Sequence, residues 1–421
     1  MREMKDSGIE WIGAIPQDWQ LSKIGSLYTQ RNEKVSDKDY QPLSVTMQGI
    51  LPQLATAAKT DDGDNRKLVR VGDFAINSRS DRRGSCGISP LDGSVSLINI
   101  ILTPRTAMHP GYYNWLFHTT LFADEFYKWG HGIVADLWTT RWQEMKSITV
   151  PVPEYAEQER IAAFLDAECA EIDAVLEKTR ASIEEYRKLK QAVITQAVTK
   201  GIRGDRPMKD SGIEWIGEIP AEWKVNLIKN VATTGSGGTP ESGNPSLYDG
   251  DINWICSYDL KERPITKSER RLTQLGADSI AGNVQLKGSV LVAMYGGSGT
   301  IGNSGILECE AKTNQAICSI KFNNGYITDY FGFYYILSIR KYWMIFAVGT
   351  RKDPNISQDI VRKMPCILPP IAEQEEIVAY CNKACDQLDT LITKKQQYLT
   401  EIETYKKSLI YEYVTGKKEV V

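Results

Sequence analysis

The sequence predicts a mixed α/β (α+β) fold in which two globular domains alternate with two long helices as a pseudo-twofold internal repeat. Three observations lead to this prediction. Residues 4–19 and 208–223 agree at 13 of 16 positions, at an offset of 204. The motif Ala-Glu-Gln-Glu recurs at 156–159 and 372–375, at an offset of 216. Each motif opens a long segment with the apolar spacing of a helix.

The two repeats divide the chain into four parts. These are a first domain with an N-terminal frame (1–153), a first long helix (154–201), a second domain (202–368) and a second long helix (369–421). The offset between copies is 204 for the first repeat and 216 for the second, so the insert between the two repeated parts is longer in the second copy. The repeated parts form a constant frame, whereas the inserts differ. The inserts, about 20–150 and 224–366, share little identity beyond their position.

The long helices are expected to pair as a coiled coil. Apolar residues three, four and seven apart form a narrow stripe on each helix, as in a coiled-coil seam. The predicted seam residues are Leu165, Ile172, Leu176, Ile183, Tyr186, Leu189 and Val193 on the first helix, and Cys381, Leu388, Ile392, Leu399, Ile402, Tyr405 and Leu409 on the second. Acids dominate the first part of each helix and bases the later part, so antiparallel pairing brings opposite charges together. A response to the helix dipole would extend over only about one turn.

Both inserts are expected to be mixed α/β. The β-type runs are Val69–Ile76, Ser289–Tyr295 and Gln315–Phe322, and the aromatic helical stretches are Tyr112–Trp129 and Tyr330–Phe346. We interpret the aromatic stretches as core rather than as platforms that stack on bases.

Composition limits the classes of function. The 421 residues are 42% hydrophobic and 24% charged, and a net charge of −3 requires any DNA-binding surface to be a local patch or to be completed by a partner. Eight cysteines without Cys-x-x-Cys pairs favour reduced thiols over a metal site. The longest strongly apolar stretch, Tyr330–Ile339, is about half of the roughly 20 residues that a membrane-spanning helix needs. The N-terminal sequence has no apolar signal core, so we expect a cytoplasmic protein.

Two segments resemble catalytic or cofactor-binding motifs, but neither fits its motif fully. Gly297–Gly302 fits Gly-x-Gly-x-x-Gly, but a Gly-broken, β-like sequence follows it, where a dinucleotide site would need a helix. Asn244–Tyr248 departs from the Asn/Asp-Pro-Pro-aromatic pattern of amino-methyltransferases at Ser246 and Leu247. We therefore expect no catalytic residues and no cofactor in this chain.

Loops rich in hydrogen-bonding side chains are the binding candidates. Three arginines in five residues can pair with guanine or hold phosphates, although a solvated turn is the simplest alternative. The candidates in the first insert are Lys59, Arg79, Asp81, Arg82 and Arg83, with Arg66, Lys67 and Arg70 nearby. The candidates in the second are Tyr258, Lys261, Tyr295, Ser298, Thr300, Asn314, Gln315, Arg351 and Lys352. Asn314 and Gln315 could instead satisfy backbone groups beside a strand.

These features together resemble the specificity subunit of type I restriction-modification enzymes over essentially the whole chain. The resemblance rests on the order and duplication of several motifs. They are the double IGxIPxxW (Ile12–Trp19 and Ile216–Trp223), residues 234–260, GTIGNSG with TNQAI (299–317), GTRKDPNIS (349–357), and the PxPxxxEQ and LPPxxEQ entries into the long helices.

The resemblance implies a DNA-recognition subunit with two target recognition domains. Each domain would read one half of a split, asymmetric site in the major groove, and the coiled coil would set the half-site spacing. The repeated frame would dock two modification (methyltransferase) subunits, and two restriction subunits would complete an ATP-dependent endonuclease in a bacterial or archaeal cytoplasm. S-adenosylmethionine, ATP and Mg²⁺ would then belong to the partners.

Three other functions compete with this one. A stand-alone sequence-specific DNA-binding regulator is the main alternative, and the acidic pI of about 5.9 argues against it. A cofactor-using enzyme built on Gly297–Gly302 would require saturable binding of NAD or S-adenosylmethionine by the chain alone. A coiled-coil scaffold without a DNA role leaves two large, unlike inserts unexplained.

Overall fold

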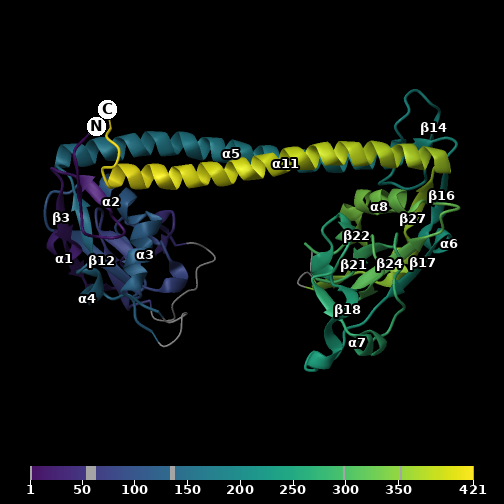
Figure 1. Cartoon of the computed structure of the whole chain (residues 1–421), viewed down its shortest axis with the longest axis horizontal. Helices are drawn as coiled ribbons and strands as arrows, with labels where there is room; N and C mark the ends of the chain where they lie inside the picture. The colour runs from purple at the N-terminus through teal and green to yellow at the C-terminus, as the bar shows by residue number, and fades with distance from the viewer. Residues whose placement is uncertain (1, 54–62, 133–137, 297–298, 351–352, 421) are drawn as a thin grey trace. The chain divides into compact units, whose positions relative to one another are not determined.

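The structure, a computed structural model, describes residues 2–53, 63–132, 138–296, 299–350 and 353–420. The chain forms two compact units (Figure 1). Unit 1 contains Met1–Arg180 and Gln396–Val421, and unit 2 contains Ala181–Lys395. Each unit therefore contains one insert, one frame and parts of both long helices, α5 (Tyr155–Lys200) and α11 (Ile371–Val414).

Unit 1 is built on an antiparallel sheet with the order β10-β9-β12-β4. Its strands are Cys86–Ile88 (β10), Phe74–Asn77 (β9), Asn99–Pro104 (β12) and Tyr28–Arg31 (β4). A second sheet contains β11 (Gly93–Val95), β8 (Arg66–Val69) and β5 (Lys34–Val35), and β6 (Leu43–Thr46) pairs with β7 (Gly49–Pro52). The helices are α1 (Ile24–Leu27), α2 (Pro110–Phe117), α3 (Thr120–Lys128) and α4 (Trp142–Met145).

Two predicted elements of unit 1 are each divided by a turn. The expected run Val69–Ile76 is the end of β8 and most of β9, separated by a turn in which Gly72 has a φ of +86°. The expected helix Tyr112–Trp129 is two helices, because Thr119 starts α3 by accepting a hydrogen bond from Phe122 N at 3.2 Å.

Unit 2 has a five-stranded sheet with the order β17-β24-β21-β22-β19. Its strands are Ala232–Ser236 (β17), Ile317–Phe322 (β24), Val290–Ala293 (β21), Ser304–Leu307 (β22) and Pro264–Ile265 (β19). A second sheet contains β20 (Arg270–Leu272), β18 (Tyr248–Ile255) and β23 (Lys312–Thr313), and β25 (Val348–Thr350) pairs with β26 (Asp353–Asn355). The helices are α6 (Ile228–Val231), α7 (Gln274–Asp278), α8 (Asp329–Ser338), α9 (Trp343–Phe346) and α10 (Gln358–Lys363).

Four strands of the two main sheets share one topology despite their unlike sequences, and unit 2 adds β19 parallel to β22. The order β10-β9-β12-β4 in unit 1 corresponds to β22-β21-β24-β17 in unit 2, with antiparallel pairing throughout. A helix follows the corresponding strand in both units, α2 after β12 and α8 after β24. The inserts are therefore two versions of one fold.

The duplicated frame forms two pairs of short antiparallel strands in each unit. In unit 1, β1 (Met4–Asp6) pairs with β2 (Ala14–Pro16), and β3 (Gln20–Lys23) with β13 (Thr149–Val152). In unit 2, β14 (Met208–Asp210) pairs with β15 (Glu218–Pro220), and β16 (Lys224–Leu227) with β27 (Pro365–Leu368).

A repeated side-chain clamp fastens each frame to the start of a long helix. In unit 1 the Trp19 indole donates to Glu157 at 2.9 Å, and Arg2 forms an ion pair with the same carboxylate. In unit 2 Trp223 donates to Glu373 at 3.0 Å, and Arg206 lies 2.5 Å from that carboxylate. The first glutamate of each Ala-Glu-Gln-Glu motif is therefore the anchor of the frame.

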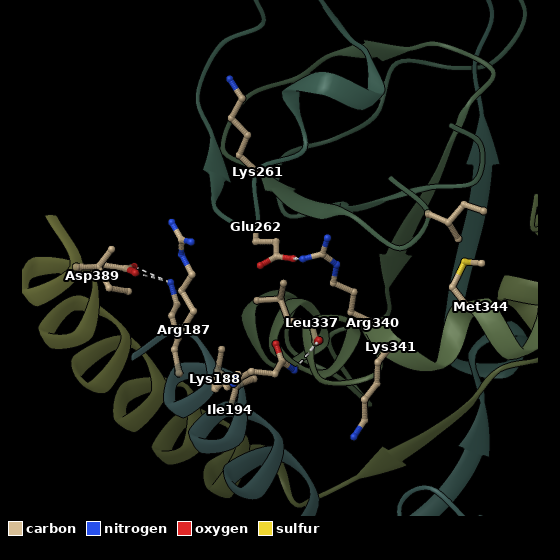
Figure 2. A pocket seen from close by; sticks show the side chains of 14 residues that line it. Arg187, Lys188, Ile194, Lys261, Glu262, Leu337, Arg340, Lys341, Met344 and Asp389 are labelled. Carbon is tan, nitrogen blue, oxygen red and sulfur yellow. Dashed lines mark hydrogen bonds and ion pairs between the residues drawn. The ribbon is translucent and has the colours of Figure 1, made fainter. Parts of the chain in front are cut away.

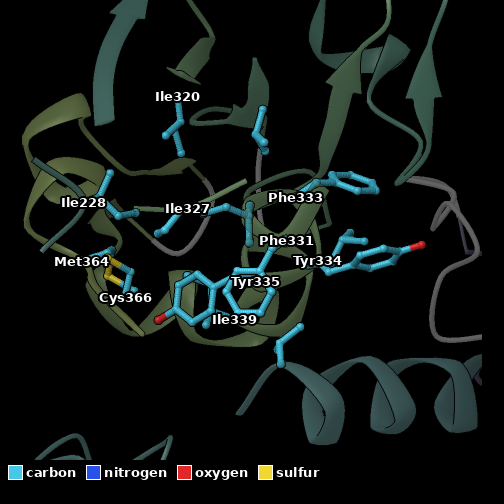
Figure 3. Close-up of a cluster of buried hydrophobic side chains, with 14 of the residues drawn as sticks. Ile228, Ile320, Ile327, Phe331, Phe333, Tyr334, Tyr335, Ile339, Met364 and Cys366 are labelled. Carbon is cyan, nitrogen blue, oxygen red and sulfur yellow. The ribbon is translucent and has the colours of Figure 1, made fainter. Parts of the chain in front are cut away.

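The aromatic stretches are core, as predicted. In unit 2, Phe331 and Tyr335 of α8 are fully buried, and α8 packs beside Ile228, Ile320 and Met364 (Figure 3). In unit 1 the fully buried residues include Tyr112, Tyr113, Phe117, Phe122 and Phe126. Burying such large side chains stabilises each by roughly 1.5–3 kcal/mol relative to exposure.

The predicted antiparallel pairing of α5 and α11 is confirmed, and within each unit the two helices lie side by side (Figure 1). In unit 1, Asp173 pairs with Lys406 at 2.6 Å and Arg180 with Glu403 at 2.5 Å. In unit 2, Lys190 pairs with Asp389 at 2.6 Å. Within unit 1, the residue number of the α11 partner falls as the residue number along α5 rises, so the two helices are antiparallel.

The predicted seam is correct except at Leu189 and Tyr405. Leu189 is 48% exposed, because the inward positions of the first helix run 183, 186 and 190. The buried seam residues are Leu165, Leu176, Ile183, Cys381, Leu388, Ile392 and Leu409. Five further seam residues are partly buried: Ile172, Tyr186, Val193, Leu399 and Ile402. Tyr405 is 54% exposed, because the inward positions run 399, 402, 406 and 409, so that Lys406 faces the seam instead.

Candidate nucleic-acid interface

The predicted binding loops lie at corresponding ends of the two main sheets. In unit 1, Asn77 at the end of β9 pairs with Asn99 at the start of β12. In unit 2, Ala293 at the end of β21 pairs with Ile317 at the start of β24. The loops that leave β9 and β21 thus occupy equivalent places. We call residues 78–85 the loop edge of unit 1, and residues 257–262, 294–296, 299–303 and 314–316 the loop edge of unit 2.

Hydrogen bonds from neighbouring residues hold the backbone of the arginine loop of unit 1. Asn77 Oδ1 accepts from Arg79 N at 3.0 Å, and the Tyr127 hydroxyl donates to Asn77 O at 3.0 Å. Residues Ser80–Arg82 form a 3₁₀ turn. This support fixes the backbone from which the charged side chains project.

The charged side chains of this loop differ in their partners. Arg79, Asp81, Arg82 and Arg83 are all exposed. Arg83 forms an ion pair with Asp124 of α3, whereas Arg82 lies 3.7 Å from Asp81 and keeps 68% of its side chain exposed. Arg79 and Arg82 are thus better placed to meet a ligand than Arg83.

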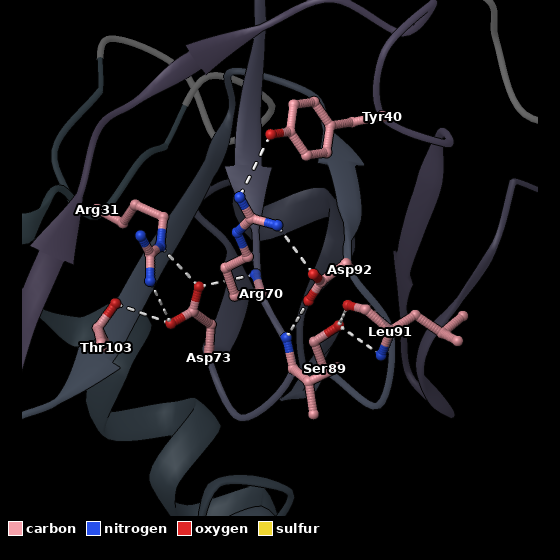
Figure 4. Close-up of polar contacts among 9 residues, drawn as sticks. Arg31, Tyr40, Arg70, Asp73, Ser89, Leu91, Asp92 and Thr103 are labelled. Carbon is pink, nitrogen blue, oxygen red and sulfur yellow. Dashed lines mark hydrogen bonds and ion pairs between the residues drawn. The ribbon is translucent and has the colours of Figure 1, made fainter.

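The neighbouring bases of unit 1 do not extend this loop edge. Arg66 is buried and donates to Ser94 O at 2.9 Å, and Lys67 donates to Asn99 O at 2.6 Å. Burial lowers the pKa of both side chains. Arg70 lies at the opposite end of β8, where it contacts Asp92 at 2.9 Å beside the Asp73 network (Figure 4). Lys59 lies outside the described residues.

Backbone hydrogen bonds bring the predicted loops of unit 2 together. Met294 N donates to Ala316 O at 2.7 Å, and Glu262 N donates to Ser304 O at 2.8 Å. Ile356 N, just after the β25–β26 hairpin, donates to Met294 O at 3.0 Å. Three segments far apart in sequence therefore meet at one place. Ser298, Arg351 and Lys352 lie outside the described residues.

The exposed side chains at this edge combine aromatic and polar groups. Tyr258 and Tyr295 are 44% and 41% exposed, and Thr300 is partly buried. Lys261 lies 3.2 Å from Glu269. The turn that carries Tyr258 is held by Asp259, which accepts from Cys256 N at 2.8 Å and whose pKa is raised by burial.

Asn314 and Gln315 have structural partners. Asn314 Oδ1 accepts from Ala316 N at 3.2 Å, which is the local backbone role that the sequence offered as an alternative. Gln315 is exposed, and its Oε1 accepts from the Thr239 hydroxyl at 2.5 Å. Of the two, Gln315 is the one placed on the surface of the loop edge.

The rejected cofactor motifs have other roles. The turn around Thr300–Gly302 leads into strand β22 and not into a helix, so the segment lacks the helix N-terminus that binds a pyrophosphate. Asn244 accepts from Ser246 N at 3.1 Å and starts a 3₁₀ turn at Pro245–Leu247.

Within the described residues no group of three or more His, Cys, Asp or Glu could hold a metal ion. None of the helices described combines the length and apolar composition that crossing a bilayer requires.

Sequence reasoning missed two groups of residues. The Arg-Glu-Trp clamp could have been found, because Arg2, Trp19 and Glu157 recur as Arg206, Trp223 and Glu373 at the two offsets. The bases of α5 were attributed to pairing between helices. Lys190 does pair with α11, but Arg187 and Lys188 line a cleft of unit 2 instead.

Comparisons with known proteins agree with one another. The family model for the type I restriction modification DNA specificity domain matches residues 220–404. The type I restriction enzyme MjaVIII specificity subunit of Methanocaldococcus jannaschii is 23% identical over 431 residues, which cover 96% of this chain and 94% of that protein. The MjaIX specificity subunit of the same organism is 24% identical over 189 residues, only 44% of this chain and 43% of that protein.

A solved structure shares the fold over most of the chain. It is described as the structural basis of complex assembly and conformational transition of the type I R-M system. The match has a TM-score of 0.74 at 14% identity and covers 96% of this chain and 99% of that chain.

Proposed function

Because this chain belongs to the type I restriction-modification specificity subunits, we propose that its two loop edges each read one half of a split, asymmetric DNA sequence in the major groove. One observation carries the proposal. A single sheet topology occurs twice, and equivalent loops present different side chains, arginines in unit 1 and tyrosines with a lysine in unit 2. Two unlike loop sets on one scaffold suit two unlike half-sites.

The side chains at the loop edges suit groove recognition. An arginine can donate two hydrogen bonds to guanine, and each such pair discriminates against a wrong base by about 1–3 kcal/mol. Arg79 and Arg82 project from a turn that is fixed by Asn77 and Tyr127, so little ordering is needed on binding. Lys261 and Tyr258 would contact phosphates or base edges in unit 2.

The frames and the long helices would serve assembly. The frame occurs twice with nearly the same sequence, and the same buried clamp fixes it to a long helix each time, so two copies of one partner can meet equivalent surfaces. We infer that these partners are two methyltransferase subunits, and that two restriction subunits join them. S-adenosylmethionine, ATP and Mg²⁺ would be bound by those partners, and this chain would supply sequence recognition without catalysis. The paired helices would set the spacing between the half-sites.

Methylation-aware sequencing of the host genome tests the proposal. Cells with the intact system should carry a two-part methylated motif with a fixed spacer, and cells lacking this chain should lose it. The double variant Arg79→Ala/Arg82→Ala should alter or abolish recognition of one half only. Lys146→Ala is the control, because Lys146 is exposed beside Gly25, near the opposite end of the unit 1 sheet and outside the frame.

A continuous motif, or an unchanged motif in the double variant, would contradict this assignment of the loop edges. Light scattering after size exclusion should show one copy of this chain with two methyltransferase subunits. Tight site-specific binding by the isolated chain, with no methylation in the cell, would instead support the stand-alone regulator.

A further inference from the structure

Unit 2 contains a cleft of about 570 Å³ between the later part of α5 and the second domain (Figure 2). It is lined by Arg187, Lys188, Lys190, Gln191, Ile194, Lys261, Glu262, Ile301, Leu337, Arg340, Lys341, Met344, Asp389 and Ile392. Gln191 Nε2 donates to Leu337 O at 3.1 Å, which fastens the helix to the domain beneath the cleft. This contact joins the two walls of the cleft.

The charge of the cleft is strongly positive. Six of its lining residues are basic and two are acidic, and both acids already have basic partners. Glu262 forms an ion pair with Arg340, and Asp389 forms one with Lys190 at 2.6 Å.

Four bases line the cleft besides these two pairs: Arg187, Lys188, Lys261 and Lys341. All four are exposed. Arg187 and Lys261 also contact glutamates outside the lining set, Glu184 and Glu269. Among the ion pairs of the described residues none involves Lys188 or Lys341, and Lys341 Nζ lies 4.9 Å from the centre of the Tyr342 ring. These two bases are therefore not neutralised by an acid and can meet an added anion.

The corresponding surface of unit 1 has a different charge. At an offset of 216, Arg187, Lys188 and Lys190 correspond to Glu403, Thr404 and Lys406 on α11. Glu403 is negative and pairs with Arg180, and Lys406 pairs with Asp173. The repeat thus preserves the lysine that joins the two helices but not the two bases beside it. A role in helix pairing does not account for Arg187 and Lys188.

The cleft adjoins the loop edge of unit 2. Lys261 and Glu262 belong to the loop edge and also line the cleft, as does Ile301. A major groove is about 12 Å wide and is bordered by phosphates on both sides. DNA whose groove meets the loop edge therefore carries a phosphate backbone beside Lys261, which is shared by the loop edge and the cleft.

We propose that this cleft binds the phosphate backbone of DNA beside the half-site read by unit 2, so that α5 takes part in DNA binding as well as in helix pairing. The inference rests on the proposed function and deepens it. Lysine binds phosphate as a point charge, and each neutralised phosphate adds about 0.9 to the salt slope of duplex binding. The contact strengthens binding without regard to sequence and acts on one half-site only.

The test uses the full chain assembled with its methyltransferase subunits. Fluorescence anisotropy would measure the affinity of the complex for two duplexes, one with the motif that the system methylates and one with a scrambled sequence. The salt concentration would vary between about 50 and 200 mM, a range in which phosphate contacts have a large effect on affinity. In Lys188→Gln/Lys341→Gln we expect the slope of log affinity against log salt to fall by about two, with both duplexes weakened by the same factor. The methylated motif itself should not change.

Two control variants separate charge from fold. Lys229→Gln removes an exposed lysine at the end of the unit 2 sheet opposite to the loop edge, and it should leave the slope unchanged. Lys188→Arg/Lys341→Arg keeps the charge and should keep the slope.

The outcomes distinguish the two proposals. An unchanged slope in Lys188→Gln/Lys341→Gln overturns the cleft assignment. Loss of the methyltransferase subunits, with DNA binding by intact complexes unchanged, also overturns it and makes the cleft a protein-docking site. If the wild-type complex shows no preference for the motif over the scrambled duplex, then the proposed function itself fails.

Discussion

Lys406 of α11 and Asp173 of α5 form an ion pair across the coiled coil of unit 1, with 2.6 Å between Nζ and a carboxylate oxygen. Lys190 and Asp389 form the same pair in unit 2 at 2.6 Å, and both residues are related to the first pair by the offset of 216. In each pair the lysine occupies the inward position and the aspartate lies at the side. The internal duplication is therefore a duplication of helix contacts, and not only of sequence.

The Lys406–Asp173 pair is expected to specify orientation more than to add stability. Its side chains are 21% and 59% exposed, and exposed pairs contribute about 0.2–1 kcal/mol. A double-mutant cycle with Lys406→Ala and Asp173→Ala, followed by urea unfolding, should give a coupling energy below about 1 kcal/mol. A coupling of several kcal/mol would show that the pair is a main source of stability. Lys406 is preferred to Lys190 for this test because Lys190 also lines the basic cleft.

Glu373→Ala should destabilise unit 2 far more than removal of a surface carboxylate. The Glu373 side chain is 2% exposed, and it accepts from both Trp223 and Arg206. Removing it leaves a buried indole N–H and a largely buried guanidinium short of a partner, which costs about 3 kcal/mol. Urea unfolding followed by tryptophan fluorescence would measure the loss. Glu376→Ala breaks the exposed Arg203 pair and is the matched control, expected to cost less than about 1 kcal/mol.

The repeat and the long helices could be predicted because they depend on local spacing. The stripes from Leu165 to Ile183 and from Leu388 to Ile402 follow a helical period, and the charge gradients favour the antiparallel pairing that Asp173 and Lys406 confirm. The shared topology of the inserts could not be predicted. A sheet order depends on which strands meet, and strands with unlike side chains can meet in the same order.

Two errors of detail have clear physical causes. The predicted stripe includes the apolar residues Leu189 and Tyr405, but the three-and-four spacing places Lys190 and Lys406 inward instead, and lysine can reach the side of the coil with its ammonium group. The three arginines of the unit 1 loop looked equivalent in sequence. Arg83 is neutralised by Asp124, which lies about 40 residues away on α3 and becomes a neighbour only in the fold.

Arg82→Ala should weaken binding of the cognate duplex by about 1–3 kcal/mol if its guanidinium reads a base edge. Arg83→Ala should have a smaller effect, because its charge is already engaged by Asp124. Affinity for duplexes that vary one base pair at a time would separate the two roles, since loss of a base contact relaxes specificity at one position. Equal weakening at every position would assign Arg82 to a phosphate.

The buried thiols should make the protein less stable in alkaline solution. Burial raises the pKa of Cys318 and Cys366 to about 12, whereas a cysteine in an unfolded chain has a pKa near 8.5. Between these values the folded state holds more protons, so the free energy of unfolding falls as pH rises, by up to about 1.4 kcal/mol per pH unit for each thiol. Urea unfolding at pH 7.5 and 9.5 under reducing conditions would measure this fall, and Cys318→Ala should reduce it.

The same burial predicts a pattern of chemical labelling. Cys309 is the partly exposed cysteine, and the other seven are buried. With a thiol reagent at pH 8 the folded protein should react first at Cys309, and the others should react only after denaturant is added. Rapid reaction of Cys366 in the folded protein would contradict the burial on which the pH prediction rests.

Shortening both long helices by one heptad tests whether they set the half-site spacing. Deleting residues 178–184 and 394–400 removes matching segments at the offset of 216 and preserves the seam period. Seven residues at about 1.5 Å each amount to roughly 10 Å, the length of about three base pairs. The methylated motif should then keep both half-sites but have a shorter spacer, or be lost if the DNA helix turns the second half-site away. An unchanged spacer would contradict a ruler role for the coiled coil. A variant with Tyr398→Ala alone, which changes an exposed helix residue without changing length, should keep the original spacer.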